Sequence, residues 1–398
     1  SGLSVGLSAC TGEMERKSLA CIQLDFFYLL SGKLLVYLLG TTLLTHCIGI
    51  WLTLLKTEEA KAVEGMDRKQ KKVIKAEYQK KGRRVLILGI LILLGVLGYL
   101  KYFDFFTTNL SYLFGHPVLE GWRPEKLLMP IGISFYTLQA IGYMTDVYWG
   151  TIQAETEIWR TALFLGFFPQ IMEGPIARYS DVADTLYTGK PLEYRNVVDG
   201  YVRIFWGLFK KMVIADRMAL MVNQVFDHYA DYHGAVILAA AIGYVIQLYM
   251  EFSGCMDIII GSGKLFGICL PENFRQPFCA KNPSEFWRRW HISLSSWFRD
   301  YVYIPLGGNR VSKIKHIRNL LIVWFLTGLW HGASWNFVVW GLFYGVILIT
   351  EKYFTGKILA KLPGAVQTLY TMILVMLGWV LFFSPTLGSA LTWIGNMF

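Results

Sequence analysis

The chain has 398 residues, of which 54% are hydrophobic, 16% aromatic and only 17% charged. An average soluble domain carries about 25% charged residues, so the composition excludes an ordinary soluble domain and indicates a polytopic membrane protein. The formal net charge is +10. Its basic residues gather between apolar segments, a pattern that the positive-inside rule explains better than nucleic-acid binding does.

Apolar runs recur along most of the chain and predict roughly eight to ten membrane spans. We expect them at about 26–55, 85–106, 127–149, 158–173, 200–222, 234–256, 258–270, 319–333, 334–350 and 365–384. The 258–270 run is short and glycine-rich, which predicts a re-entrant piece. The 200–222 stretch carries five charged residues, which favours a helix along the membrane interface.

A basic loop is predicted at residues 56–84, between two of the clearest apolar runs. It holds eleven Lys or Arg and five Asp or Glu, so we expect it on the cytoplasmic side. No internal repeat is visible in the chain, which weighs against the secondary transporters that are built from repeated halves.

The segment "KNPSEFWRRWHISLSSWFRDYVYIPLGGNR", residues 281–310, predicts one amphipathic helix. Asn282 can cap it, Pro283 suits its first position, and Glu285 stands three residues after the cap. Its apolar face would carry Trp287, Trp290, His291, Leu294, Trp297, Phe298 and Tyr301. A membrane-interface helix explains such an aromatic face, and a functional role for His291 stays open beside that interpretation.

A second histidine, His331, stands in the apolar stretch "GLWHGASWN", residues 328–336. Ionisable residues in membrane spans are rare, and they usually face a cavity or a partner. Gly328 and Gly332 are small, so neighbouring helices can approach closely. A neutral histidine that is hydrogen-bonded between helices is the alternative to a functional one.

Several common catalytic motifs are missing from the sequence. Neither histidine belongs to an HExxH pair or a Cys/His cluster, so we predict no metal site. There is no GxSxG elbow, Walker A loop or kinase motif set. The sequence therefore gives no support to a serine hydrolase, a transport ATPase or a lipid kinase.

Six stretches together resemble the membrane-bound O-acyltransferase (MBOAT) superfamily, and within it the bacterial alginate O-acetyltransferase-like branch. They are "MPIGISFYTLQAIGYMTDVYWG" (129–150), "FFPQIMEGPIARYSD" (167–181), "GLFKKMVIADR" (207–217), "YMEFSGCMDIIIG" (249–261), "NFRQPFCAKNPSEFWRRWHISLSSWFRDYVYIPLGGNR" (273–310) and "NLLIVWFLTGLWHGASWNFVVWGLFYG" (319–345). They cover most of residues 127–345 in family order.

The resemblance implies an all-α polytopic membrane protein, with a ring of tilted helices around a central tunnel and with re-entrant and interfacial helices. We expect residues 1–398 to form one integral-membrane domain, with the catalytic blocks in 127–345. Residues 1–24 match no part of the family. The family's additional N-terminal hairpin is not found before Asp25, and members usually continue beyond Phe398, so we expect both ends to be truncated.

The resemblance also implies that His331, in the WHG motif, is the catalytic residue and that His291, in the WHIS motif, is a second tunnel residue. We hypothesise that His331 takes the proton of the acceptor hydroxyl. His291 would orient the donor or stabilise the developing oxyanion. Weaker candidates for the tunnel or the donor site, which helix packing explains equally well, are Asn336, Trp290, Arg288, Arg289, Glu251, Ser253 and Asp257.

These expectations describe an O-acetyltransferase of the bacterial cytoplasmic membrane. It would move an acetyl group from a cytoplasmic thioester, either acetyl-CoA or an acyl carrier, to a hydroxyl of an extracellular or cell-envelope polysaccharide, directly or through a partner protein. We expect no bound cofactor. D-alanyl transfer to teichoic acid from a carrier protein is an alternative, although "YVYIPLGGNR" favours the acetyl branch. A lipid-linked glycan transporter and an inactive export-complex subunit are further alternatives.

Overall fold

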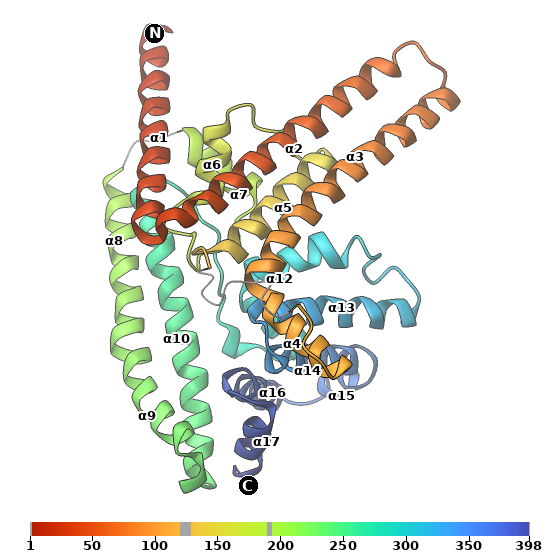
Figure 1. The fold of residues 1–398 in the computed structure, drawn as a ribbon. Coiled ribbons are helices and arrows are strands. Elements are labelled where there is room, and N and C mark those ends of the chain that lie inside the picture. Colours follow the sequence, from red (N-terminus) through yellow and green to blue (C-terminus); the bar gives the residue numbers. More distant parts are fainter. Residues whose placement is uncertain (1, 120–128, 189–192, 398) are drawn as a thin grey trace. The chain divides into compact units, whose positions relative to one another are not determined.

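The computed structural model describes residues 2–119, 129–188 and 193–397 (Figure 1). Every regular element in these ranges is a helix, so the prediction of an all-α protein is confirmed. The contacts between residues group the chain into two compact units. The first contains residues 1–197 and 263–270, and the second contains residues 198–262 and 271–398. A single ring of helices across both units remains a prediction.

The first unit is built around three helices that pack against one another. Its helices are α1 (Gly2–Ser31), α2 (Leu35–Ala62), α3 (Arg68–Leu97), α4 (Phe103–Phe114), α5 (Ile133–Trp149), α6 (Ile158–Gly166) and α7 (Tyr179–Thr188). Helices α2, α3 and α5 contact one another, while α1 packs against α6 and α7 (Figure 1). A 3-10 turn at Gly32–Leu34 joins α1 to α2, and a π-helical turn at Gly98–Tyr102 joins α3 to α4.

The basic segment 56–84 is mostly helical, so the prediction of a loop there is wrong. It comprises the end of α2 and the first half of α3, which a short turn connects. Asp67 caps α3 by accepting a hydrogen bond from the backbone N–H of Gln70 at 2.8 Å. Because this cap starts α3 inside the basic sequence, the charges extend along a helical hairpin.

The second unit holds both histidine motifs. Its helices are α8 (Tyr194–Leu208, which begins in the first unit), α9 (Asp216–Asp227), α10 (Ala235–Leu265, which ends in the first unit), α11 (Pro283–Arg289), α12 (Ile292–Phe298), α13 (Lys313–His331), α14 (Trp335–Thr350), α15 (Gly356–Leu359), α16 (Gly364–Phe383) and α17 (Leu387–Gly395). π-helical turns at Phe209–Ala215, Arg299–Tyr303 and Glu351–Thr355 follow α8, α12 and α14.

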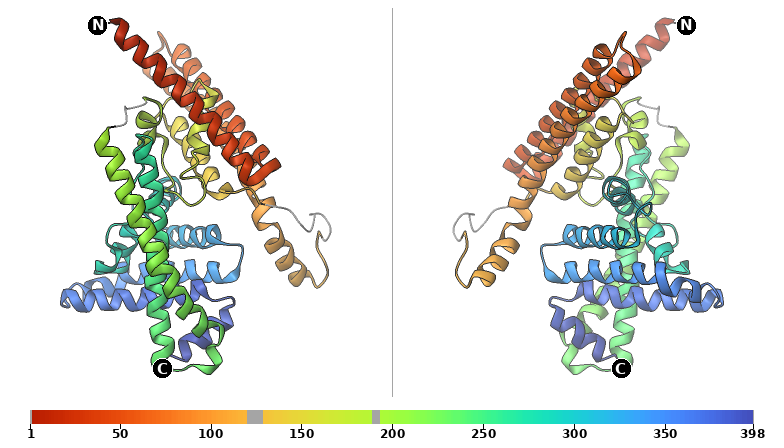
Figure 2. Two further views of the ribbon diagram at one scale, coloured as in Figure 1. Left: turned by 90° about the vertical axis from the view of Figure 1, so that its left-hand side faces the viewer. Right: turned by 90° about the vertical axis from the view of Figure 1, so that its right-hand side faces the viewer.

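Helix α10 is one continuous helix of 31 residues, so the prediction of a separate re-entrant piece at 258–270 is wrong. It lies along α8 and α9 (Figure 2). Gly207 and Gly254 bring α8 and α10 so close that a Cβ on either would collide with the other's carbonyl oxygen. Within the 258–270 run, Gly261 packs in the same way, because a Cβ there would lie 2.8 Å from the carbonyl oxygen of Gly200 in α8.

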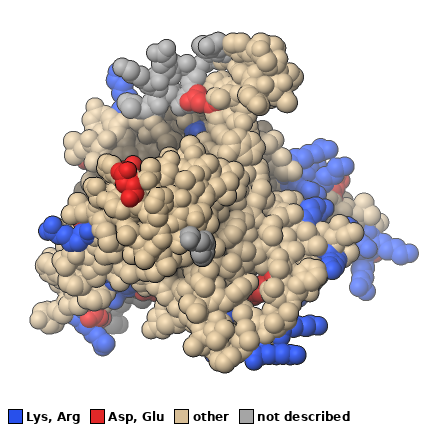
Figure 3. Space-filling model, turned by 90° about the horizontal axis from the view of Figure 1, so that it is seen from below, with Lys and Arg blue, Asp and Glu red and all other residues tan. Residues whose placement is uncertain are grey.

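Five helical segments of the described chain are long and apolar enough to cross a membrane. They are Arg16–Ala62, Arg68–Phe114, Ala235–Leu265, Trp335–Leu359 and Gly364–Phe383. The sequence predicts more spans, but α5 has only 17 residues and α13 begins with a basic turn. Much of the surface seen in Figure 3 carries neither acidic nor basic side chains, as expected of a multi-pass membrane protein.

Candidate active site

His331 is the last residue of α13, and the turns of α13 that precede it pack closely against α14. A Cβ on Gly328 would collide with the carbonyl oxygen of Phe337, and a Cβ on Gly341 would collide with that of Trp324. The predicted close approach beside His331 is confirmed. Extended backbone at Gly332 then ends α13, and the Ser334 hydroxyl caps α14.

The WHIS segment contains two short helices, so the prediction of one helix across 281–310 is wrong. The predicted cap is confirmed, because the Asn282 side chain accepts a hydrogen bond from the Glu285 N–H at 2.7 Å. The Glu285 carboxylate in turn accepts one from the Lys281 N–H at 2.8 Å. However, α11 ends at Arg289, and His291 adopts a left-handed conformation with φ = 47°.

The break at His291 is held by a segment that runs beside it. The carbonyl oxygen of Asn273 accepts a hydrogen bond from the Ile292 N–H at 3.0 Å, and the Arg275 N–H donates to the carbonyl oxygen of Arg289 at 2.9 Å. The Asn273 side chain also accepts from the Ser293 N–H at 3.0 Å. These bonds replace those of a continuous helix. A left-handed non-glycine residue costs roughly 1–3 kcal/mol, and such residues cluster at functional sites.

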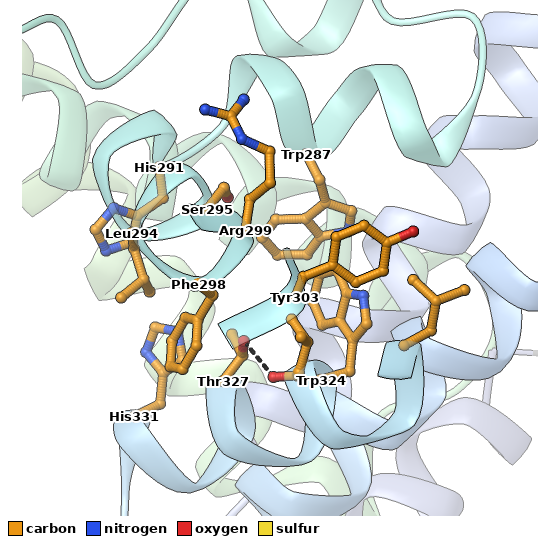
Figure 4. Close-up of a pocket in the computed structure, with 12 residues that line it drawn as sticks. Trp287, His291, Leu294, Ser295, Phe298, Arg299, Tyr303, Trp324, Thr327 and His331 are labelled. Carbon is orange, nitrogen blue, oxygen red and sulfur yellow. Dashed lines mark hydrogen bonds between the residues drawn. The ribbon is translucent and has the colours of Figure 1, made fainter. Parts of the chain in front are cut away.

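The two histidines meet in one cavity of about 160 Å³ (Figure 4). Its lining comes from α11, α12, the following π-helical turn, and α13: Trp287, His291, Leu294, Ser295, Phe298, Arg299, Tyr303, Leu320, Val323, Trp324, Thr327 and His331. The α13 residues recur at helical spacing and form one stripe that ends at His331. The imidazole rings of His291 and His331 lie with their centroids 6.4 Å apart.

The surroundings of both histidines are mainly aromatic. Phe252 and Trp330 lie 4.9 and 5.9 Å from the His291 ring. Trp340 and Phe382 lie 5.0 and 5.3 Å from the His331 ring. His291 is only 3% exposed, and burial lowers its pKa to about 3. The His291 ring is therefore neutral at neutral pH, with one nitrogen protonated and the other carrying a lone pair.

Two of the weaker candidates, Trp290 and Asn336, do not line the cavity. Trp290 is buried in an aromatic core, with its ring 5.0 Å from both Phe274 and Trp379. The Asn336 side chain donates a hydrogen bond to the carbonyl oxygen of Ser384 and so ties α14 to the end of α16.

Arg288 and Arg289 lie on a separate open depression that they share with Arg275 and Gln276. Arg289 forms an ion pair with Glu285 at 2.5 Å. This depression is close to His291 in the chain, because Arg289 lies two residues before His291. The backbone of Arg289 is also hydrogen-bonded to that of Arg275. A surface with three arginine side chains has the chemistry to hold a phosphate group.

Three further candidates lie on α10 and contact basic residues of α8 and of the π-helical turn that follows it. These candidates, which do not line the cavity, are Glu251, Ser253 and Asp257. Lys211 pairs with Glu251 at 2.6 Å, and Lys210 lies 3.3 Å from the Ser253 hydroxyl. Asp257 is 8% exposed and accepts from Arg203 at 2.9 Å and from Lys210 at 2.6 Å. Three of the charged residues within 200–222 thus pair with α10, while the exposed side of this segment includes the apolar residues Val202, Phe205 and Trp206.

The sequence did not single out Asn273, which contacts His291 directly. The Asn273 side chain is fully buried, and its Oδ1 lies 3.4 Å from the His291 Nδ1. Eighteen residues separate the two along the chain, so no local pattern links them. Ser295, Arg299 and Thr327, which also line the cavity, carried no separate signal in the sequence.

Comparison with known proteins adds to this geometry. Residues 154–384, more than half of the chain, match the MBOAT, membrane-bound O-acyltransferase family. The chain belongs to this family. Both histidines of the cavity lie within the matched residues, and this MBOAT protein is a multi-pass protein of the bacterial cytoplasmic membrane.

The names of curated relatives refer to alginate, peptidoglycan and teichoic acid. A probable alginate O-acetylase of Pseudomonas syringae pv. tomato is 38% identical over 319 residues, which are 80% of this chain and 61% of that protein. A peptidoglycan O-acetyltransferase of Helicobacter pylori is 36% identical over 78% of this chain and 64% of its own. A teichoic acid D-alanyltransferase of Bacillus subtilis is 31% identical over 58% and 61%. The chain thus spans about three fifths of the length of the relatives it matches.

Proposed function

We propose that this MBOAT protein is an O-acyltransferase that moves an acetyl group from a thioester to a hydroxyl. The observation that carries the proposal is the meeting of His291 and His331 in one largely apolar cavity. Transfer to an alcohol needs a group that removes the hydroxyl proton as the oxygen attacks, and histidine is the side chain best suited to this at neutral pH.

The proposed reaction needs no covalent intermediate with the protein. The acceptor oxygen attacks the thioester carbonyl while His331 takes the hydroxyl proton. The tetrahedral intermediate collapses, the carbon–sulfur bond breaks, and the protonated His331 returns its proton to the departing thiolate. The products are an ester and a free thiol, and His331 is regenerated. General-base assistance of this kind contributes roughly 10²–10⁴ in rate.

The cavity walls support this chemistry in two ways. Leu294, Phe298 and Trp324 are buried and apolar, so the walls limit competing hydrolysis of the thioester. A low local dielectric also strengthens the polar interactions that remain. His291, which is neutral and 6.4 Å from His331 between ring centroids, orients the reacting groups.

The relatives favour acetyl as the acyl group. Identity to the probable alginate O-acetylase is 38% over 80% of the chain, against 31% over 58% for the teichoic acid D-alanyltransferase. We propose a cell-envelope polysaccharide as the final acceptor, reached directly or through a partner protein. D-alanyl transfer to teichoic acid is the second candidate because that relative is also similar.

We propose a cytoplasmic thioester as the donor, either acetyl-CoA or an acyl carrier. Both donors carry a phosphate group that a basic surface can bind. The depression with Arg275, Arg288 and Arg289 would receive that phosphate. Its backbone link to His291 supports delivery of the thioester toward the cavity.

The test is to express the chain in a host that lacks its own envelope acyltransferase but carries the genes beside it. Acetate and D-alanine released from the envelope by mild base are then measured. Acetate above the empty-vector level is the expected result. Alanine in its place would move the chain to the teichoic-acid branch, and neither ester, with the protein folded in the membrane, would refute acyl transfer.

A further inference from the structure

Asn273 contacts His291 and the two residues that follow it in the chain. Its backbone carbonyl accepts from the Ile292 N–H and its Oδ1 accepts from the Ser293 N–H, both at 3.0 Å. The same Oδ1 lies 3.4 Å from the His291 Nδ1. Its Nδ2 donates to the thioether sulfur of Met256 at 3.3 Å.

These contacts determine the orientation of the Asn273 side-chain amide, that is, the positions of its oxygen and its nitrogen. The Ser293 N–H can only donate, so the atom that faces it must be the oxygen. A thioether sulfur can only accept, so the atom that faces Met256 must be the nitrogen. The group that His291 meets is therefore a hydrogen-bond acceptor. A neutral imidazole in contact with an acceptor carries its proton on the nitrogen that faces it.

We infer that Asn273 is a positioning residue that holds neutral His291 with its proton on Nδ1. The other ring nitrogen, Nε2, then carries the lone pair. His291 consequently accepts a hydrogen bond from a substrate O–H or N–H in the cavity, and it does not donate one to the developing oxyanion. This inference rests on the proposed function for its role in catalysis, but the proton position is a property of the protein alone.

Few other ionisable groups face His291. His331, Arg299 and Tyr303 line the same cavity. On the α10 side, Asp257 follows Met256 in the chain, and its carboxylate is paired with two basic side chains at 2.9 and 2.6 Å. A carboxylate placed at position 273 would therefore be the acidic group in direct contact with the His291 ring.

The direct test is the position of the proton. The full chain, labelled with ¹⁵N-histidine and reconstituted in bilayers at pH 7, is studied by solid-state NMR, and the His291→Gln variant identifies the His291 signals. We expect a neutral ring protonated on Nδ1. A neutral ring protonated on Nε2, or an imidazolium, would overturn the inference whether or not the protein transfers an acyl group.

The functional test is the pH dependence of acyl transfer in the Asn273→Asp variant. This change keeps an acceptor for the Ser293 N–H but places a negative charge beside His291, which raises the pKa of the imidazole. As the pH falls, the ring gains a proton and loses its lone pair. Since burial sets the His291 pKa at about 3, a rise of about three pH units, the upper end of what an adjacent opposite charge produces, brings it to about 6. We therefore expect the variant to lose activity at about pH 5–6 relative to the unaltered chain, with activity recovered at higher pH.

Met256→Leu is the matched control, since it removes only the partner of the Asn273 Nδ2. We expect its profile to match that of the unaltered chain. If Asn273→Asp instead keeps or increases activity at low pH, a protonated His291 is a useful donor and the inference is wrong. If the unaltered chain transfers no acyl group at all, the proposed function fails, and the NMR result alone decides the inference.

Discussion

The Gly341→Ala substitution should separate α13 from α14 and misplace His331. A Cβ on Gly341 would collide with the carbonyl oxygen of Trp324 and lie 3.0 Å from the Cα of Gly328. Carbon atoms pack at about 3.5–4.0 Å. Because both groups belong to the backbone of α13, no side chain can rotate away. The helices must move apart by at least about 1 Å at the turn that precedes His331.

A displacement of about 1 Å at a catalytic group can cost about 100-fold in rate. Overpacking of this kind also destabilises a fold by about 1–3 kcal/mol. We therefore expect kcat for acyl transfer to fall about 100-fold at matched levels of folded protein. The assay is ester formation from a radiolabelled acetyl donor, with folding monitored by thermal melting in detergent.

Alanine substitutions at two other glycines serve as controls for the loss of activity in Gly341→Ala. At Gly345, one turn along α14, a Cβ would lie 3.2 Å from the Cβ of Trp324, so we expect a loss below about tenfold. At Gly40 in α2 a Cβ would meet nothing within 4 Å, so Gly40→Ala should leave the rate unchanged. If Gly341→Ala kept more than half of the activity, the packing argument for the position of His331 would be refuted.

Three other predictions concern stability, measured by thermal melting of the purified chain. Asp257→Ala leaves the partly buried Lys210 without its carboxylate, while Arg203 keeps its ion pair with Glu272. It should therefore cost about 3 kcal/mol, whereas a loss below about 1 kcal/mol would show that the pairs are incidental. Asn282→Ala removes the cap of α11 and should cost about 1 kcal/mol, with Asn282→Asp as the variant that retains it. His316 is 5% exposed and bonds the hydroxyls of Tyr303 and Tyr353 at 2.9 and 2.7 Å, so His316→Leu should cost about 1–3 kcal/mol, and unchanged melting would contradict these bonds.

Local patterns were sufficient for several parts of the fold. Apolar runs located helices, the Asn282 cap begins α11 where the sequence placed it, and small residues beside His331 predicted a close helix contact. These features depend on residues near one another in the chain. The importance of both histidines came from the family resemblance, because spacing alone left their structural roles open.

Other parts depend on distant partners and could not be predicted from local patterns. The helix break at His291 needs the hydrogen bonds of Asn273, which lies outside the segment that was read as one helix. The ion pairs of Arg203, Lys210 and Lys211 could not be predicted because their partners lie on the distant helix α10, and the interfacial position of 200–222 stays a prediction. Gly261 contributed to the predicted break because the sequence does not show that it packs against α8.

The most direct test of the account is the dependence of ester formation on His331. The unaltered chain and His331→Ala are expressed at matched membrane levels in the host without its own envelope acyltransferase, and base-labile acetate is measured. We expect acetate in the first sample and a loss of at least about 100-fold in the second. Equal acetate from both samples, with the variant folded, would contradict the assignment of His331 as the catalytic base.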